Sequence, residues 1–118
     1  MLDTTQLNLE LVIENIRLIE HRFQKIKTAS DFVTTDEGLL ILDAIAMRLQ
    51  FMGECIKRID KSDPSFFIMH TTIEWSKVIN LRDFISHHYE MLNHEIIFNI
   101  CSVYITQLKL SIQQILTT

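Results

Sequence analysis

Three residues of types suited to proton and phosphate chemistry lie within eight positions: Arg82, His87 and Tyr89. An imidazole with an ordinary pKa of about 6.5 can take up and release a proton near neutral pH. A guanidinium fork matches the oxygens of a phosphorane that gains negative charge. Such a set could move the proton of an RNA 2′-hydroxyl and protonate the leaving 5′-oxygen. No metal is required, because the nucleophile belongs to the substrate. The tyrosine could stack on a base or bond a phosphate.

The spacing of these residues limits how one chain could use them. On a continuous helix Tyr89, seven residues after Arg82, returns to nearly the same face, whereas His87, five residues after Arg82, lies about 140° away. His87 can therefore join the other two only if the helix breaks near it or if a second subunit completes the site. Asn93, a candidate N-cap of a following helix, favours a break near His87.

Several neighbouring polar residues have competing interpretations. Glu54 could pair with Arg82 across the molecule, or with Lys57 or Arg58 on its own helix. His88 could be catalytic, but an exposed surface position is favoured.

Other residues that could carry chemistry are better explained without it. His94 and Glu95 suit the first turn of a helix, and His87 and His94 lack the i, i+4 spacing of a helical zinc pair. We therefore expect no metal and no cofactor. Trp75 is interpreted as a core anchor rather than a base-stacking platform. The two cysteines lie in apolar helical patterns without a CxxC motif and are predicted to be reduced core thiols (Cys55 and Cys101).

The elements that must position these residues are helices. Apolar residues recur at intervals of three and four in segments 9–26, 42–59, 75–85 and 97–115. Ile100 and Tyr104 fall on the apolar stripe of the last segment, and Tyr104 is expected to be buried. Capping boxes are predicted at Thr34-x-x-Glu37 and Thr71-x-x-Glu74, and Pro64 ends the second helix. Segment 66–70 is ambiguous. The pattern predicts one all-α domain over residues 1–118, an antiparallel four- to five-helix bundle.

Composition agrees with a small helical domain. The 118 residues include only two Gly and one Pro, with 47% apolar residues, whereas β-rich folds need many turn residues. The net charge of −4 excludes a protein that binds RNA through bulk electrostatics, so any RNA contact must be local. We see no signal peptide and no uncharged apolar stretch approaching the ~18 residues of a membrane span, and we expect a cytoplasmic protein with no membrane partner.

The segment Arg82-Asp83-Phe84-Ile85-Ser86-His87-His88-Tyr89 resembles the Arg-x4-His-x-Tyr signature of HepT proteins, the toxin half of MNT/HEPN toxin–antitoxin pairs. Residues 51–58, with Gly53-Glu54, resemble the family's Gly-Glu-Ala-containing second helix. Residues 73–79 resemble its Pro-Trp-x-x-Ile approach to the motif, although Glu74 stands where many relatives have Pro. The resemblance covers roughly residues 37 to 116.

This resemblance implies a HEPN-like bundle that forms homodimers, with the two motif segments meeting in a cleft between subunits. It implies a metal-independent endoribonuclease of a type VII-like pair, with Arg82 and His87 catalytic and RNA as substrate, tRNA being one candidate. Asp83, Ser86 and Glu54 would support the site. It further implies a cognate MNT-type nucleotidyltransferase antitoxin that adds AMP to the motif tyrosine, which corresponds to Tyr89.

Two other functions remain open from the sequence. One is a non-catalytic HEPN relative that only accompanies a nucleotidyltransferase. The complete set of Arg82, His87 and Tyr89 argues against it, because such proteins commonly lack the full set. The other is a purely structural dimerisation domain, for which the apolar seams alone would suffice.

Overall fold

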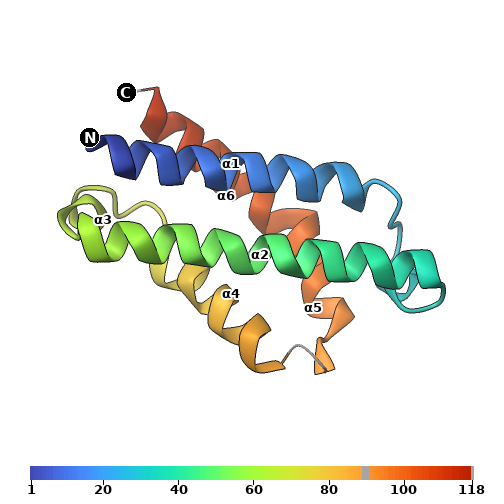
Figure 1. Cartoon of the computed structure of the whole chain (residues 1–118). Coiled ribbons are helices and arrows are strands. Elements are labelled where there is room, and N and C mark those ends of the chain that lie inside the picture. The colour runs from blue at the N-terminus through green and yellow to red at the C-terminus, as the bar shows by residue number, and fades with distance from the viewer. Residues whose placement is uncertain (89–90, 118) are drawn as a thin grey trace.

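The computed structural model describes residues 1–88 and 91–117, with only the backbone of His88. Two long antiparallel helices, α1 (Asp3–Phe23) and α2 (Asp36–Ser62), form one layer of the molecule (Figure 1). The predicted apolar stripes of both face each other, and their central residues have no exposed surface: Leu9, Val12, Ile16 and Ile19 on α1, and Ile45, Leu49, Met52, Ile56 and Ile59 on α2. The antiparallel packing predicted for the first two helices is confirmed.

The link between these helices differs in detail from the prediction. α1 ends at Phe23, so the buried side chain of Ile26 belongs to the link and not to the helix. A short 3₁₀ helix, η1 (Ala29–Phe32), follows. The predicted cap at Thr34 is wrong by one residue, because the Thr35 hydroxyl accepts the Gly38 N–H at 2.9 Å. The helix therefore begins where a threonine oxygen can reach an orphan amide.

The chain after α2 turns at Pro64, as predicted. The ambiguous segment forms a short helix, α3 (Ser65–Met69). Helix α4 (Trp75–His88) comes next. It begins at Trp75, so the capping box predicted at Thr71 is wrong: Thr71 lies a full turn upstream. Trp75 is the predicted core anchor, since it is buried and its Nε1 donates to the His70 carbonyl at 2.7 Å.

The last helical stretch has three parts: α5 (His94–Asn99), a π-helical turn η3 (Ile100–Tyr104) and α6 (Ile105–Leu116). Asn93 is its N-cap, as predicted, and its side chain accepts the N–H groups of Glu95 and Ile96 at 2.9 and 3.2 Å. The π turn accommodates an extra residue. Consequently Cys101 and Ile105 face the core, while Ile100 and Tyr104, which the uninterrupted pattern placed there, are only half-buried.

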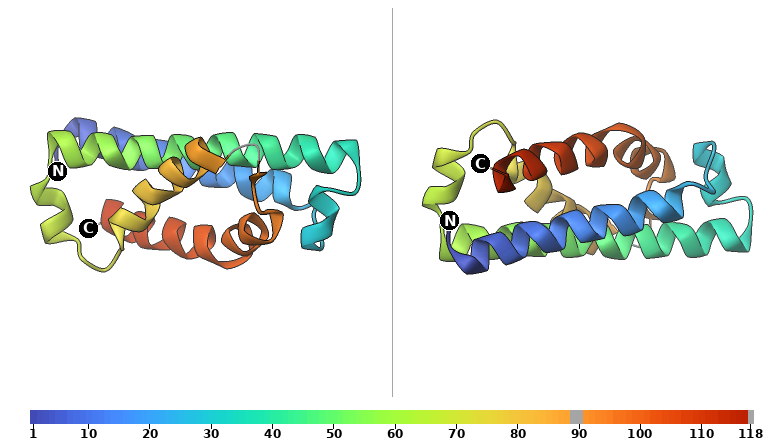
Figure 2. Two further views of the ribbon diagram at one scale, coloured as in Figure 1. Left: turned by 90° about the horizontal axis from the view of Figure 1, so that it is seen from below. Right: turned by 90° about the horizontal axis from the view of Figure 1, so that it is seen from above.

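The helices form a bundle of two layers. α1 and α2 make one layer and α6 lies in the other, with α4 crossing obliquely on one side (Figure 2). Among the described residues all regular structure is helical, so the predicted all-α bundle is confirmed.

By length and composition, the described helical stretch His94–Leu116 could cross a membrane. It contains Glu95 and Lys109, and core helices of folded proteins pass the same test, so this is weak evidence for a span.

Candidate active site on helix α4

Helix α4 presents Arg82 at the edge of its contact with α2. Val78, Leu81 and Ile85 are buried on the core side of α4. Gly53 of α2 lies directly against the Arg82 backbone. A Cβ added at Gly53 would stand 2.5 Å from the Arg82 Cβ and 3.1 Å from its N. The two helices therefore approach so closely at Arg82 that a residue with a Cβ at position 53 would clash with α4.

Two carboxylates fix the orientation of the Arg82 guanidinium. Its Nε donates to Glu54 Oε1, and its Nη1 donates to Asp83 Oδ1 at 3.2 Å. Of the three partners left open for Glu54, the structure shows Arg82 rather than Lys57 or Arg58. The Arg82 side chain keeps 30% of its surface exposed. Because a guanidinium carries five N–H donors, the group retains donors for an anionic ligand after both pairings.

His87 and Ser86 lie in the last turn of α4, and both are exposed. The helix runs without interruption from Arg82 through His88, so the break that would bring His87 onto the Arg82 face does not precede His87. Five residues of continuous helix set the two directions about 140° apart. Within one chain, therefore, the structure places Arg82, Glu54 and Asp83 together and leaves His87 directed elsewhere.

Two sequence-predicted residues cannot be placed. Tyr89, the candidate for RNA contact and modification, lies outside the described residues. The side chain of His88 does too. The proposed roles of both residues stay predictions.

Sequence reasoning missed the role of Gly53 and a basic–aromatic contact beside the site. The guanidinium carbon of Arg58 lies 5.5 Å from the centroid of the half-buried Phe51 ring. A signal for Gly53 was present, since a lone glycine inside a long helical pattern often marks a close approach of another backbone. Arg58 adds positive charge one turn beyond Glu54, on the same helix.

Tyr104 is not buried, contrary to expectation. It is half-buried in the π turn, with Lys77 Nζ 4.7 Å from its ring centroid. Burial, with a smaller contribution from the carboxylate of Glu74, raises the pKa of Tyr104 to about 12. The hydroxyl therefore stays protonated at neutral pH.

Cys55 and Cys101 are buried, as predicted, and burial raises the pKa of their thiols to about 11 and about 12.

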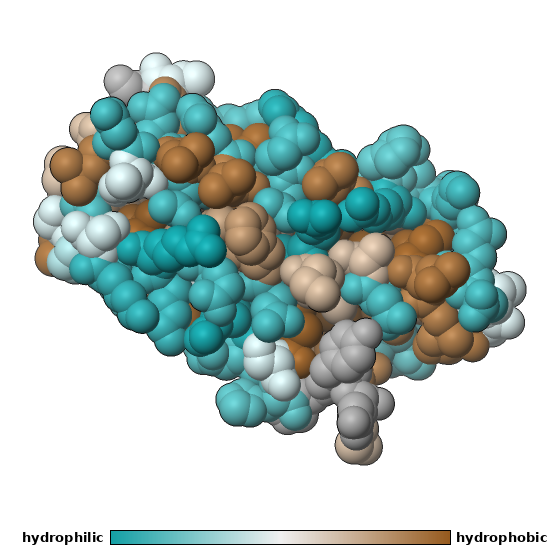
Figure 3. Space-filling view, viewed as in Figure 1, coloured by the Kyte–Doolittle hydropathy of each residue, from teal (hydrophilic) through white to brown (hydrophobic). Residues whose placement is uncertain are grey.

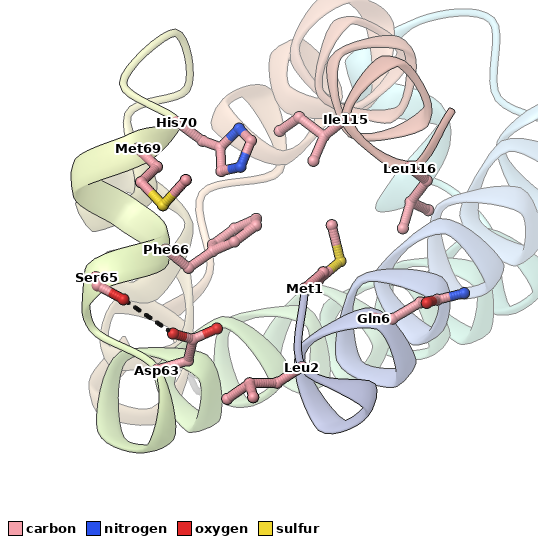
Figure 4. A pocket seen from close by; sticks show the side chains of 10 residues that line it. All are labelled: Met1, Leu2, Gln6, Asp63, Ser65, Phe66, Met69, His70, Ile115 and Leu116. Atoms are coloured by element: carbon pink, nitrogen blue, oxygen red, sulfur yellow. Dashed lines mark hydrogen bonds between the residues drawn. The ribbon is translucent and has the colours of Figure 1, made fainter. Parts of the chain in front are cut away.

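A cavity of about 550 Å³ lies at the end of the bundle where both chain ends meet, and it does not include Arg82 or His87 (Figure 4). Asp63 is the charged group in its wall, but both of its oxygens are engaged. They accept the hydroxyls of Thr5 at 2.8 Å and Ser65 at 3.2 Å. The His70 ring packs on Phe66 with centroids 4.5 Å apart. These polar groups serve packing, so the candidate site is the surface of α4 rather than this cavity.

Within the described part of the chain, no three His, Cys, Asp or Glu side chains gather closely enough to hold a metal ion. The groups brought together around Arg82 are instead suited to an anion, because the hydrogen bonds to Glu54 and Asp83 leave other guanidinium donors unpaired among the described residues.

The fold and site define an all-helical protein whose candidate anion-binding group is held by carboxylates between two helices. A family model described as "Ribonuclease HepT-like" matches residues 12–115. The chain therefore belongs to the HepT-like ribonuclease family, which implies ribonuclease activity with RNA as the substrate. No curated protein and no solved structure matches the chain.

Proposed function

We propose that this chain is the toxin of a type VII-like MNT/HEPN toxin–antitoxin pair and cleaves RNA without a metal ion through Arg82 and His87. The observation that carries the proposal is the orientation of the Arg82 guanidinium at the edge of α4: Glu54 and Asp83 hold it, and among the described residues its other donors have no hydrogen-bond partner. Family membership supplies the substrate class. The expected compartment is the cytoplasm, where RNA is the accessible substrate.

In the proposed reaction, the 2′-oxygen of RNA attacks the adjacent phosphorus. The P–O bond to the 5′-oxygen breaks, which leaves a 2′,3′-cyclic phosphate and a 5′-hydroxyl. His87, exposed at the end of α4, takes the 2′-hydroxyl proton or supplies the one that the 5′-oxygen needs. Arg82 binds the phosphorane oxygens as their charge develops. Because the two residues point about 140° apart on one helix, the pair that acts on one phosphate comes from two subunits of a homodimer.

The direct test compares cleavage of total RNA and purified tRNA in excess chelator by the parent, Arg82→Ala and His87→Ala. Loss of a general acid or base should reduce the rate about 100- to 10,000-fold. Arg17→Ala, which removes a 56% exposed arginine side chain from α1, and His94→Ala are matched controls, which should stay within a few-fold of the parent. Cleavage that chelator abolishes would contradict the metal-free reaction. A His87→Ala protein that cleaves like the parent would contradict the site. A folded parent that cleaves no RNA, yet binds a nucleotidyltransferase, would indicate the non-catalytic alternative.

Regulation by an MNT-type nucleotidyltransferase belongs to the same proposal. An AMP group on Tyr89, seven residues past Arg82 on the chain, would add a phosphodiester charge that competes with RNA phosphate for the guanidinium. Tyr104 is a poorer target, because it is half-buried beneath Lys77 and its pKa is raised to about 12.

Co-expression with a nucleotidyltransferase, with intact-mass and peptide measurements, tests this regulation. AMP is expected on Tyr89, with loss of cleavage, and Tyr89→Phe should escape while Tyr104→Phe should not. If the transferase fully inhibits the Tyr89→Phe protein, binding rather than modification silences the toxin.

A further inference from the structure

The Arg58 guanidinium is held by an aromatic ring and not by a carboxylate. Its central carbon lies 5.5 Å from the centroid of the half-buried Phe51 ring, within the range of a cation–π contact. Among the described residues, no carboxylate lies within ion-pair distance of Arg58. The group is therefore oriented by the ring, while its N–H donors remain available for an anion.

The contact with Phe51 fixes the direction of the Arg58 side chain along α2. The two residues are two helical turns apart, which is about 10 Å along the helix axis. Because their side chains nevertheless meet, the long Arg58 side chain extends back toward Phe51. Glu54 lies on the intervening turn, on the same side of the helix, and accepts the hydrogen bond from Arg82 Nε. Both guanidinium groups therefore approach the turn of α2 that carries Glu54.

The charge of α2 changes sign along the helix in the direction of Arg58. Residues 36–53 carry three carboxylates and one cation, namely Asp36, Glu37, Asp43 and Arg48. Residues 54–61 carry three cations and two carboxylates, namely Lys57, Arg58, Lys61, Glu54 and Asp60. In the space-filling view, hydrophilic side chains predominate over this C-terminal part of α2, and apolar side chains gather toward its N-terminal end (Figure 3). On a protein of net charge −4, the C-terminal part of α2 is a local region that attracts a polyanion.

We propose that Arg58, supported by the Phe51 ring, binds the phosphate next to the one that is cleaved, so that the RNA strand runs from Arg82 along the C-terminal part of α2. This subsite rests on the proposed function, because that function places the cleaved phosphate at Arg82. The guanidinium donates charged hydrogen bonds to phosphate oxygens and does not read the base. Such a contact fixes the register of the strand without selecting its sequence.

An RNA strand fits this position better than a small anion does. A nucleic acid carries a phosphate at every nucleotide, so a strand with one phosphate at Arg82 has the next within reach of a cation one helical turn away. The net charge of the protein provides no general attraction for RNA. Binding must therefore depend on a few local phosphate contacts, and Arg58 supplies one of them.

The salt dependence of RNA binding tests the subsite. The measurement is fluorescence anisotropy of a labelled single-stranded oligouridylate with proteins that all carry His87→Ala, so that the RNA stays intact. In this background Arg58→Gln should bind about tenfold more weakly, the loss expected for one charge-assisted hydrogen bond. The slope of log Kd against log[KCl] should also fall by about 0.7, which is the contribution of one phosphate contact on a single strand.

Two further variants separate the position of the charge from its presence. Arg17→Gln removes the same charge from a 56% exposed side chain on α1 and should keep the parental slope. Arg58→Lys keeps a charge at this position and should also keep the slope, although it lacks the planar fork. The proposal is overturned if Arg58→Gln keeps the parental slope or if Arg17→Gln reduces it equally. Weaker binding of a nucleotidyltransferase by Arg58→Gln, at an unchanged RNA slope, would assign Arg58 to a protein partner instead.

The role of the ring is tested by Phe51→Leu, which keeps an apolar side chain but removes the aromatic face. The Arg58 charge remains, so the salt slope should be parental. Binding should weaken by about two- to fivefold, because an exposed cation–π contact is lost. Helical circular dichroism should match that of the parent. Parental RNA affinity in this variant would overturn the role given to the ring.

Substrate length distinguishes the subsite from the place of the cleaved phosphate. A dinucleoside monophosphate has a single phosphate, whereas a longer oligonucleotide has neighbouring ones. The loss of kcat/KM caused by Arg58→Gln should be about tenfold greater on the longer RNA, mainly through KM. Equal losses on both substrates would overturn the subsite. A parent that cleaves neither RNA, while Arg58→Gln reduces the binding slope, would refute the proposed function and leave Arg58 as an RNA contact.

Discussion

At the scale of single residues, Arg82 depends on partners from two parts of the chain. Glu54 holds its Nε and Asp83 holds its Nη1. The planar fork of arginine makes this possible, because one nitrogen can be anchored while others remain directed at a ligand. Lysine offers a single charged centre, so it could not pair with Glu54 and bind an anion in the same way.

The two thiols should be inert in the folded protein. Burial raises the pKa of Cys55 to about 11 and that of Cys101 to about 12, and the thiolate is the reactive form. Alkylation at pH 8 should therefore be slow in buffer and rapid in denaturant. Met47→Cys, which adds an exposed thiol, is the control and should react at once. Fast labelling of the native parent would show that the core opens readily.

The same raised pKa values predict a loss of stability at high pH. In the unfolded chain the thiols ionise near their ordinary pKa of 9.0, while in the fold they remain protonated. The unfolded state therefore binds fewer protons above pH 9, and the free energy of unfolding should fall as pH rises from 9 toward 12. Urea titrations at pH 7, 9 and 10.5 would measure this, and a Cys55→Ser, Cys101→Ser protein should show a smaller decline. A flat profile in the parent would contradict the prediction.

At the scale of elements, the α2–α4 contact is set by one missing side chain. In Gly53→Ala the new Cβ would lie 2.5 Å from the Arg82 Cβ and 3.0 Å from the Val78 carbonyl oxygen. Because backbone must move to relieve this contact, we expect a loss of about 1–3 kcal/mol in the free energy of unfolding. Ribonuclease activity should also fall, since α4 carries Arg82.

Urea unfolding and a cleavage assay would measure both effects. Gln50→Ala, at a half-buried position one turn earlier on α2, should change neither by much. A Gly53→Ala protein as stable and active as the parent would show that the helices can separate at no cost.

The start of α2 offers a comparison between adjacent threonines. The Thr35 hydroxyl caps the helix by accepting the Gly38 N–H, so Thr35→Ala should reduce the free energy of unfolding by about 1 kcal/mol. Thr34→Ala removes the same atoms from an exposed position outside the cap and should have little effect. Thermal or urea unfolding of both variants distinguishes the positions, and an equal loss in the two would exclude Thr35 as the cap.

At the scale of the whole molecule, a dimer couples stability to protein concentration. If two chains pair, as the proposed reaction requires, dilution favours the unfolded monomers, and the Tm of the parent should rise with protein concentration. Calorimetry or circular dichroism melts at about 2 and about 100 µM would measure the difference. A parent Tm that is independent of concentration would contradict a dimer at these concentrations.

The sequence alone determined the helices, most of their buried faces and the candidate site residues. Apolar spacing near 3.6 residues is a local property, so the seams through Leu49 and Ile56 could be predicted without knowledge of their neighbours. The stop at Pro64 and the cap at Asn93 arise equally from local chemistry, because each acts on backbone groups within a few residues.

Only the tertiary structure decided which partners the site residues have. Glu54 pairs with Arg82 rather than with its helical neighbours because Gly53 lets α4 come close, and no local pattern encodes which helices meet. The π turn at Ile100–Tyr104 likewise reflects packing, since an extra residue keeps both α5 and α6 turned toward the core. The sequence also could not predict that α4 continues without a break through His88. The packing around the last turn of a helix helps to decide where that helix ends.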